Sequence, residues 1–211
     1  MTTVKLIHST TDGDDLIAYM ARVSNPANQN TKDSARLISY LIKHNHWSPF
    51  EMVNMCVEIE TTRSIAAQIL RHRSFSFQEF SQRYAAVTEP AIVPELRRQD
   101  TKNRQNSVDD IDEDKKKFFN AKIEHLYSEC YNVYQDLLEA GVAKECAREV
   151  LPLATPTHLY MNGTLRSWIH YCNLRCGNGT QLEHKRIADA CKALIQQSFP
   201  GTYKAVFAVS E

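Results

Sequence analysis

The sequence predicts a fold that mixes helices with β-structure in a single domain spanning residues 1–211. Residues 54–61 alternate apolar and polar side chains with a period of two, as a half-buried strand does. Several other segments repeat apolar residues at spacings of three and four, which indicates amphipathic helices. A chain of 211 residues is long enough to bury a substantial core.

The first half of the chain is predicted to hold three helices around the strand. They are expected over residues 14–23, 34–44 and 63–73. Asn25-Pro26 breaks the chain between the first two, and Thr62 can cap the third. From the end of the third helix to Tyr84, apolar residues show no regular spacing.

The second half begins with a long loop over residues 85–112, which holds prolines and a polar run. A long amphipathic helix is predicted from Lys115 to Ala140, and Gly141 stops it. The remaining predicted elements are helices over 143–150, 164–175 and 181–198 and a strand over 158–162.

Charge and hydropathy set limits on the partners of the chain. Lys and Arg total 25 and so do Asp and Glu, so no strong overall field attracts nucleic acid or an acidic membrane. No segment approaches the ~20 apolar residues of a membrane span, and the first residues lack a secretory leader pattern. We therefore expect a cytoplasmic protein without nucleic-acid or membrane partners, whose anion sites are built locally.

The six cysteines are scattered without a Cys-x-x-Cys pair. This pattern fits neither a zinc ribbon nor a dense disulfide framework, so reduced thiols are expected. Cys172, Cys176 and His184 are close in sequence but lack a fourth ligand at a standard spacing. No metal is predicted.

The densest polar cluster runs from Arg71 to Tyr84, RHRSFSFQEFSQRY. Arginine forks suit phosphate, and amides and hydroxyls suit a pyrimidine or a sugar, so the cluster is typical of a nucleotide site.

Chemistry alone leaves three other interpretations of this cluster open. A charged helix end followed by a solvated loop is one of them. A nucleic-acid-binding module could stack bases on Phe75, Phe77 and Phe80, although the zero net charge weakens that interpretation. A histidine phosphatase would need Arg-His-Gly, where this chain has Arg73.

Several short motifs, including the polar cluster, follow one another in a defined order along the chain. Arg71-His72-Arg73 is followed by seven residues and then Ser81. Four further motifs occur in the same order as in one known family: Ala21-Arg22-Val23-Ser24, His46-Trp47-Ser48-Pro49-Phe50-Glu51, Ala147-Arg148 before Leu151-Pro152-Leu153, and Asn173-Leu174-Arg175. From about residue 16 to about residue 199, the chain resembles the flavin-dependent thymidylate synthase family, also called thymidylate synthase complementing protein.

The resemblance implies an α+β fold, with an antiparallel or mixed sheet and a helical part that carries the Arg-His-Arg motif helix. It implies an enzyme that methylates dUMP to dTMP with methylenetetrahydrofolate as carbon donor. The implied hydride source is FAD, which NADPH reduces. The family's members are homotetramers, so a homotetramer is expected here.

Site residues follow from the resemblance, position by position. The implied flavin contacts are Ser24 from another subunit, Arg71, His72, Arg73, Glu79, Thr164, Arg166 and His170. The implied dUMP contacts are Gln68, Glu79, Ser81, Gln82, Arg83, Arg148 and Arg175. The chain departs from the family at Met52, where a histidine is frequent.

The two residues expected to carry catalysis are Arg148 and Ser81. Arg148 is predicted to stabilise negative charge that develops on the uracil carbonyl. Ser81 is predicted to hydrogen bond the nucleotide, because no base is spaced to deprotonate it. No cysteine stands in the Pro-Cys-His context of the unrelated folate-only enzymes, so no protein nucleophile is expected.

Overall fold

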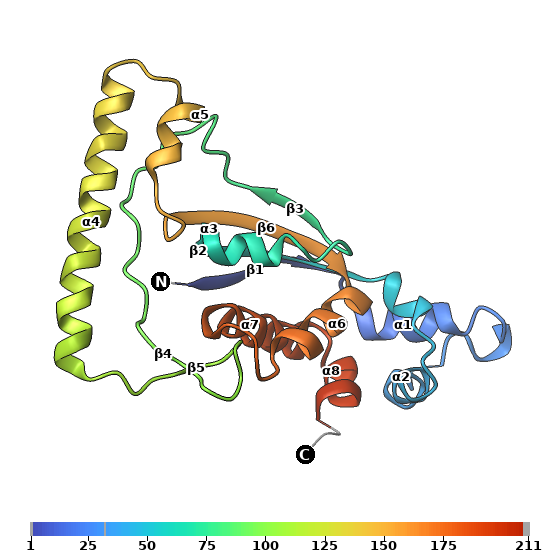
Figure 1. Cartoon of the computed structure of the whole chain (residues 1–211). Coiled ribbons are helices and arrows are strands. Elements are labelled where there is room, and N and C mark those ends of the chain that lie inside the picture. Colours follow the sequence, from blue (N-terminus) through green and yellow to red (C-terminus); the bar gives the residue numbers. More distant parts are fainter. Residues whose placement is uncertain (1, 32, 209–211) are drawn as a thin grey trace.

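The computed structural model describes residues 2–31 and 33–208 and combines helices with an antiparallel sheet, which confirms the α+β prediction. The main sheet has the strand order β1-β2-β6-β3, and every neighbouring pair is antiparallel (Figure 1). Its strands are β1 (Thr3–Ser9), β2 (Asn54–Thr62), β6 (Pro156–Thr164) and β3 (Ser76–Glu79).

The two central strands, β2 and β6, bury one face of the sheet. Val57 pairs with Met161 and Ile59 with Leu159, and all four side chains are fully buried. The residues between them, such as Glu58, are only partly buried. The alternation that predicted a strand over residues 54–61 therefore marks a sheet with one covered face.

Helices cover that buried face. The helices around the sheet are α1 (Gly13–Ala21), α2 (Ser34–Lys43), α3 (Arg63–Ile69), α6 (Leu165–Arg175), α7 (Leu182–Ser198) and α8 (Pro200–Phe207), with short 3₁₀ turns η1 (Pro26–Asn28) and η2 (Ser48–Glu51). Trp168 of α6 is fully buried, and its indole Nε1 donates to the Met55 carbonyl at 2.8 Å.

Gly163 of β6 lets an aromatic ring reach the sheet. A Cβ at this position would lie 2.4 Å from Cδ1 of Phe75, closer than van der Waals contact allows. Phe75 instead packs edge-on against Trp168, with ring centroids 4.7 Å apart. This packing anchors the segment between α3 and β3.

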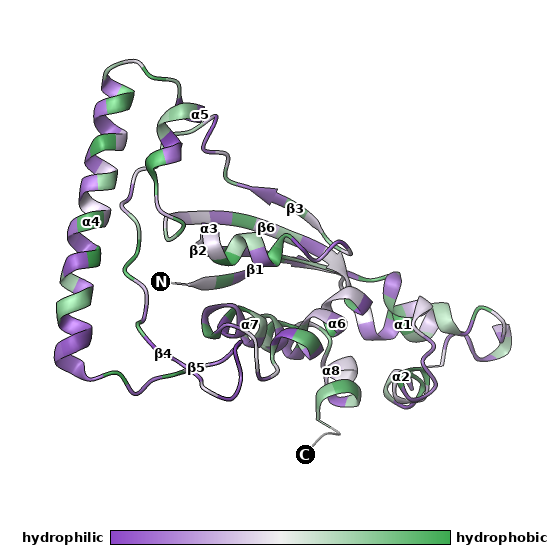
Figure 2. Ribbon diagram, in the orientation of Figure 1, coloured by the Kyte–Doolittle hydropathy of each residue, from purple (hydrophilic) through white to green (hydrophobic). Residues whose placement is uncertain are grey.

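A long arm stands beside the sheet. It consists of α4 (Glu113–Glu139), α5 (Lys144–Ala147) and the 3₁₀ turn η3 (Arg148–Val150) (Figure 1). A small second core joins Val87, Tyr134 and Ala147, and the Tyr134 hydroxyl accepts from the Val87 amide at 3.0 Å. Hydrophobic and hydrophilic residues alternate along α4 in Figure 2, as the predicted amphipathic pattern requires. Gly141 ends the arm's helix with φ +80°, as predicted.

The predicted loop over residues 85–112 contains a small hairpin that the sequence did not reveal, β4 (Arg98–Gln99) with β5 (Ser107–Val108). Side chains attach this loop to α7. Arg97 pairs with Glu183 at 2.6 Å, and Arg186 pairs with Glu95.

Several other boundaries differ from the predictions. The helix expected over residues 63–73 ends at Ile69, and β1, β3 and α8 were missed. The amide of His72 donates to the Ile69 carbonyl at 3.0 Å, which turns the chain so that Phe75 can be buried. Among the described residues, no helix is long and apolar enough to cross a membrane.

Candidate active site

The Arg-His-Arg motif lies in the turn between α3 and β3, so the expectation of a motif helix was wrong in detail. The guanidinium groups of Arg71 and Arg73 are exposed, and neither has a hydrogen-bond or ion-pair partner within residues 2–31 and 33–208. The turn thus presents two cations while His72 between them is half-buried.

His72 meets the end of α6. Arg175 Nε donates to His72 Nε2 at 2.9 Å, across 103 residues of sequence. The imidazole also packs edge-on against Tyr171, with ring centroids 4.9 Å apart. Burial, then the charge of Arg175 and then His170 lower the pKa of His72 from 6.5 to about 4. A neutral ring with an accepting Nε2 is therefore the form that Arg175 holds.

Gln68 belongs to the same cluster. Its Nε2 donates to Gln181 Oε1 at 2.7 Å, and its Oε1 lies 3.3 Å from Nδ1 of His184. Three predicted site residues, Gln68, His72 and Arg175, thus come together from the motif segment and from α6. His184 was not among the predicted site residues, and its wholly buried position in the periodic pattern of α7 gave no sequence signal.

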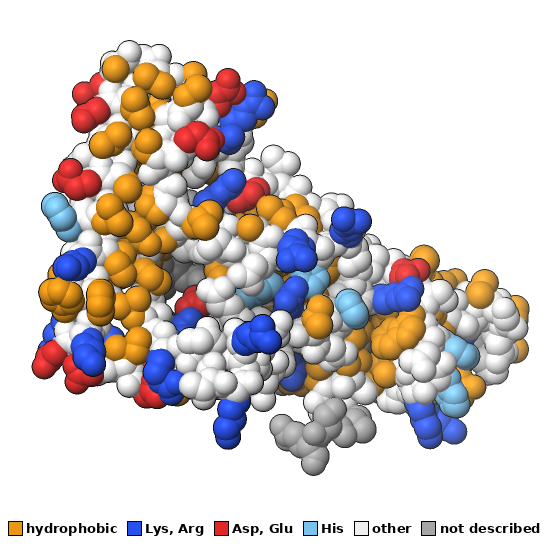
Figure 3. Space-filling model, viewed as in Figure 1, with side chains coloured by type: hydrophobic (Ala, Val, Ile, Leu, Met, Phe, Trp, Pro, Cys, Tyr) orange, Lys and Arg blue, Asp and Glu red, His pale blue; other side chains and the backbone are white. Residues whose placement is uncertain are grey.

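An open groove of about 500 Å³ runs beside this turn. Its walls come from η2, α6 and the residue that follows the motif: Trp47, Glu51, Ser74, Arg166, Ser167, Ile169, His170 and Asn173. The groove contains two predicted flavin contacts, Arg166 and His170, which share one face of α6. Figure 3 shows cationic and histidine side chains gathered over α6 and the α3–β3 turn.

Trp47 joins the groove to the core. It packs on the buried Phe50, with ring centroids 5.7 Å apart, and it also lines the groove. Arg166 pairs with Glu51 across the opening. Thr164 caps α6, since its hydroxyl accepts from the Ser167 amide at 3.3 Å.

The remaining motif residues lie at the end of β3 and just beyond it. Glu79 Oε1 accepts from Arg63 at 2.7 Å and from the Thr157 hydroxyl at 2.9 Å. Gln82 is buried, and its Nε2 has no partner among the residues that the structure describes. Arg83 pairs with Glu145 at 3.0 Å on the surface.

Ser81 begins the turn that follows β3. Its carbonyl accepts from the amides of Tyr84 and Ala85, both at 3.1 Å. No histidine or carboxylate within the described ranges hydrogen bonds its hydroxyl.

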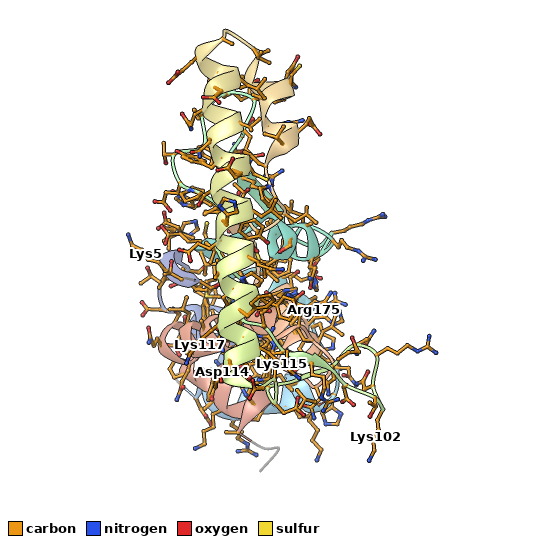
Figure 4. The ribbon with its side chains drawn as sticks, turned by 60° about the vertical axis from the view of Figure 1, so that its left-hand side comes forward. Lys5, Lys102, Asp114, Lys115, Lys117 and Arg175 are labelled. Atoms are coloured by element: carbon orange, nitrogen blue, oxygen red, sulfur yellow. The ribbon has the colours of Figure 1, made fainter. Side chains whose placement is uncertain are left out.

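Two predicted contacts lie outside this cluster. Ser24 is exposed in the turn after α1. Arg148 begins η3, where its Nε lies 3.4 Å from Glu149 Oε1. In Figures 1 and 4 the α5 segment that precedes Arg148 lies at the upper end of the arm, whereas Arg175 lies much lower, at the end of α6. Within the described part of the chain, the two arginines have separate partners, His72 for Arg175 and Glu149 for Arg148.

The described residues that line the groove include no cysteine. Burial raises the pKa of Cys191, and a hydrogen bond with Cys176 together with burial raises that of Cys172. The same hydrogen bond lowers the pKa of Cys176, but this sulfur faces Cys172 and Asp189 rather than the groove. Among the described residues, no three His, Cys, Asp or Glu side chains are arranged to hold a metal ion.

An α+β fold in which two exposed arginines, unpaired within the described residues, lie next to an open groove defines a protein suited to binding anionic ligands. The particular family follows from comparison with known proteins. The model of the family described as "Thymidylate synthase complementing protein" matches residues 5–201, so the chain belongs to that family.

Relatives and solved structures agree with this membership. The chain is 54% identical over 187 residues to "Flavin-dependent thymidylate synthase" of Synechocystis sp., covering 89% of this chain and 86% of the relative. It is 51% identical over 205 residues to "Probable flavin-dependent thymidylate synthase" of Paramecium bursaria Chlorella virus 1, covering 97% and 95%.

The UMP/dUMP methylase PolB from Streptomyces cacaoi, solved with 5-Br dUMP, superposes with a TM-score of 0.88 at 27% identity. The match covers 99% of this chain and 95% of PolB.

Proposed function

We propose that this protein is a flavin-dependent thymidylate synthase that converts dUMP to dTMP. Methylenetetrahydrofolate would donate the carbon, and FAD reduced by NADPH would supply the hydride. The observation that carries the proposal is that relatives at 51–54% identity over most of the chain bear this name. The intact motif order supports it.

The donor set on the surface fits a flavin dinucleotide. Arg71 and Arg73 offer exposed guanidinium groups to its phosphates, and such charge-assisted contacts suit phosphate oxygens. Arg166 and His170 offer donors inside the groove, with Thr164 at its edge. We assign Ser24 to the flavin site of a neighbouring subunit.

The nucleotide is assigned to the surface around Gln68 and Arg175, next to His72, which we assign to the flavin site. Arg175 is fixed by its hydrogen bond to His72, so its remaining N–H groups are oriented before a ligand arrives. Glu79, Ser81, Gln82 and Arg83 would contribute from the segment after β3. The unpartnered, buried Nε2 of Gln82 is consistent with a ligand contact in that segment.

The chemical role of the protein is to orient flat molecules and to stabilise charge. Arg148 would stabilise the negative charge that develops on the uracil carbonyl, since a guanidinium keeps its charge at any physiological pH. Ser81 would hydrogen bond the nucleotide rather than attack it, because a neutral hydroxyl without a base is a poor nucleophile.

A homotetramer is part of this proposal. Arg148 follows α5 of the arm and Arg175 ends α6, and no hydrogen bond or ion pair joins them among the described residues, so we infer that a site using both takes one of them from a second copy. The arm also exposes large hydrophobic side chains on α4, namely Phe118, Phe119, Leu126 and Val133 (Figure 3). Contact between copies would cover this surface.

The test is a product assay on the purified protein. Bound oxidised flavin should colour it yellow, and dTMP should form from dUMP only when methylenetetrahydrofolate and NADPH are both present. A colourless protein that binds no added FAD and forms no dTMP would contradict the proposal.

UMP is the second substrate to test. The solved neighbour PolB is described as a UMP/dUMP methylase, and the chain shares its fold at a TM-score of 0.88. Parallel assays with UMP and dUMP would measure the preference through the ratio of kcat/KM values.

A further inference from the structure

A row of hydrogen bonds joins the surface at the start of α7 to the core. Gln181 Nε2 donates to Glu183 Oε2 at 3.0 Å, and Gln68 Nε2 donates to Gln181 Oε1 at 2.7 Å. Next, His184 Nδ1 lies 3.3 Å from Gln68 Oε1. The row ends where His184 Nε2 lies 3.1 Å from the Tyr171 hydroxyl.

Glu183 decides which atoms donate and which accept along this row of hydrogen bonds. Burial tends to raise the pKa of Glu183, but hydrogen bonds, led by the one from Arg97, outweigh burial and hold this pKa below its ordinary value. An ionised carboxylate only accepts. Gln181 must therefore turn its amide nitrogen toward Glu183 and its carbonyl oxygen toward Gln68.

The donor and acceptor atoms of Gln68 and His184 follow in the same way. Gln68 gives one N–H to Gln181, so its carbonyl oxygen faces His184. Only a proton on Nδ1 of His184 can donate to that oxygen, which leaves Nε2 to accept from Tyr171. Burial raises the pKa of Tyr171, so its hydroxyl stays protonated and donates.

His184 is held in this neutral form by its surroundings. The side chain is fully buried, and burial, then the charge of Arg175 and then His72 lower its pKa from 6.5 to about 4. The other titratable group facing it is the Tyr171 hydroxyl, 3.1 Å away on α6.

We propose that His184 is a positioning residue for the nucleotide site: with its proton on Nδ1, it locks the Gln68 carboxamide so that the second N–H of Gln68 remains free for an acceptor oxygen of the nucleotide. This inference rests on the proposed function. It gives Gln68 a defined role as donor, and His184 acts only through Gln68.

Two substitutions of His184 separate this role from a purely structural one. Asparagine places an N–H near the position of Nδ1, and glutamine places its amide near the position of Nε2. His184→Asn should bind dUMP within about threefold of wild type, and His184→Gln should bind it at least about tenfold more weakly. Flavin content should be unchanged in both. Calorimetry with dUMP measures the effect.

A surface variant covers the case in which a buried substitution prevents folding. Gln181 is exposed, so Gln181→Leu should fold, and it removes the acceptor that orients Gln68. Its dUMP affinity should fall several-fold. Lys185→Ala is the matched control on the same helix, because it breaks only the pair with Asp189 and should leave dUMP binding unchanged.

The hydrogen-bond row has its own readout. In protein labelled with ¹⁵N-histidine, NMR should show His184 neutral with the proton on Nδ1. A proton on Nε2 would overturn the proposal, as would equal dUMP affinities in the asparagine and glutamine variants. A wild-type protein that binds no dUMP would overturn the proposed function as well, and the NMR result would still decide the state of His184.

Discussion

Two regions of the molecule hold the predicted nucleotide-binding arginines in different ways. On the covered side of the sheet, Arg175 is fixed against His72 at 2.9 Å, in a cluster packed on Tyr171. On the arm, Arg148 pairs with its sequence neighbour Glu149 at 3.4 Å, and Arg83, in the segment after β3, pairs with the exposed Glu145 of α5. The first region is a binding surface that one chain orders by itself, whereas the second presents cations that suit a site completed by another copy.

The largest effect is expected from removing the packing behind the first region. Trp168→Ala deletes a fully buried indole that contacts Phe75 and donates to the Met55 carbonyl. The free energy of unfolding should fall by about 3 to 5 kcal/mol. Urea denaturation would measure it, and a loss under 1 kcal/mol would mean that this core does not support the motif turn.

Removal of the exposed motif cations should weaken flavin binding and leave the free energy of unfolding unchanged. Arg71→Ala and Arg73→Ala each remove a charge-assisted contact worth roughly 1.5 to 3 kcal/mol. Flavin content, read from the absorbance of the purified protein, should fall in both. Normal flavin content in both variants would show that the turn does not hold the cofactor.

Acid should destabilise the first region. The pKa of His184 is lowered to about 4 from 6.5, so the unfolded chain binds more protons between these values. The contribution of His184 to the free energy of unfolding is therefore fully present above about pH 6.5 and is lost as the pH falls toward 4. The loss should be on the order of 2 kcal/mol between about pH 6.5 and pH 5.

The control for this pH effect is His184→Gln, which removes one of the two histidines of this region with a lowered pKa and leaves His72 in place. Its stability should change less than that of wild type over the same pH range. Parallel curves for the two proteins would contradict the assignment of the effect to His184.

The smallest effect is expected on the arm. Glu145→Gln breaks the surface pair with Arg83, whose side chains are 53% and 61% exposed. Such pairs contribute about 0 to 1 kcal/mol, so thermal denaturation should hardly change. A larger loss would show that this exposed ion pair, rather than the small core of Val87, Tyr134 and Ala147, holds the arm to the segment after β3.

The contrast between the regions also explains what the sequence could predict. Strand β2 and helix α4 carry strong periods in their own residues, and both were predicted within a few positions. Strand β3 has only four residues and depends on pairing with β6. Helix α8 is anchored by Asp14, which accepts from the amides of Gly201 and Thr202, a contact that no local pattern reveals.

In the candidate site, too, the short sequence motifs were predictable and the contacts between distant residues were not. The Arg-His-Arg motif and Arg175 were found through a resemblance carried by motif order, and the structure brings His72 and Arg175 together. His184 was missed because its role depends on Gln68 and Tyr171, which lie 116 and 13 residues away. Where the motif helix ends was also not readable, because burial of Phe75 decides it.

A hybrid assay tests most directly whether two copies complete one site. Arg148→Ala and Arg175→Ala should each lose dTMP formation, roughly 100-fold, because each removes a charged contact to the nucleotide. Differently tagged chains of the two variants would be co-expressed and purified through both tags, so that every oligomer contains both.

If each site takes Arg175 from one chain and Arg148 from another, random mixing restores both arginines in about one quarter of the sites. The hybrid should then regain roughly that fraction of wild-type dTMP formation. A flavin-loaded hybrid as inactive as its parents would contradict the account.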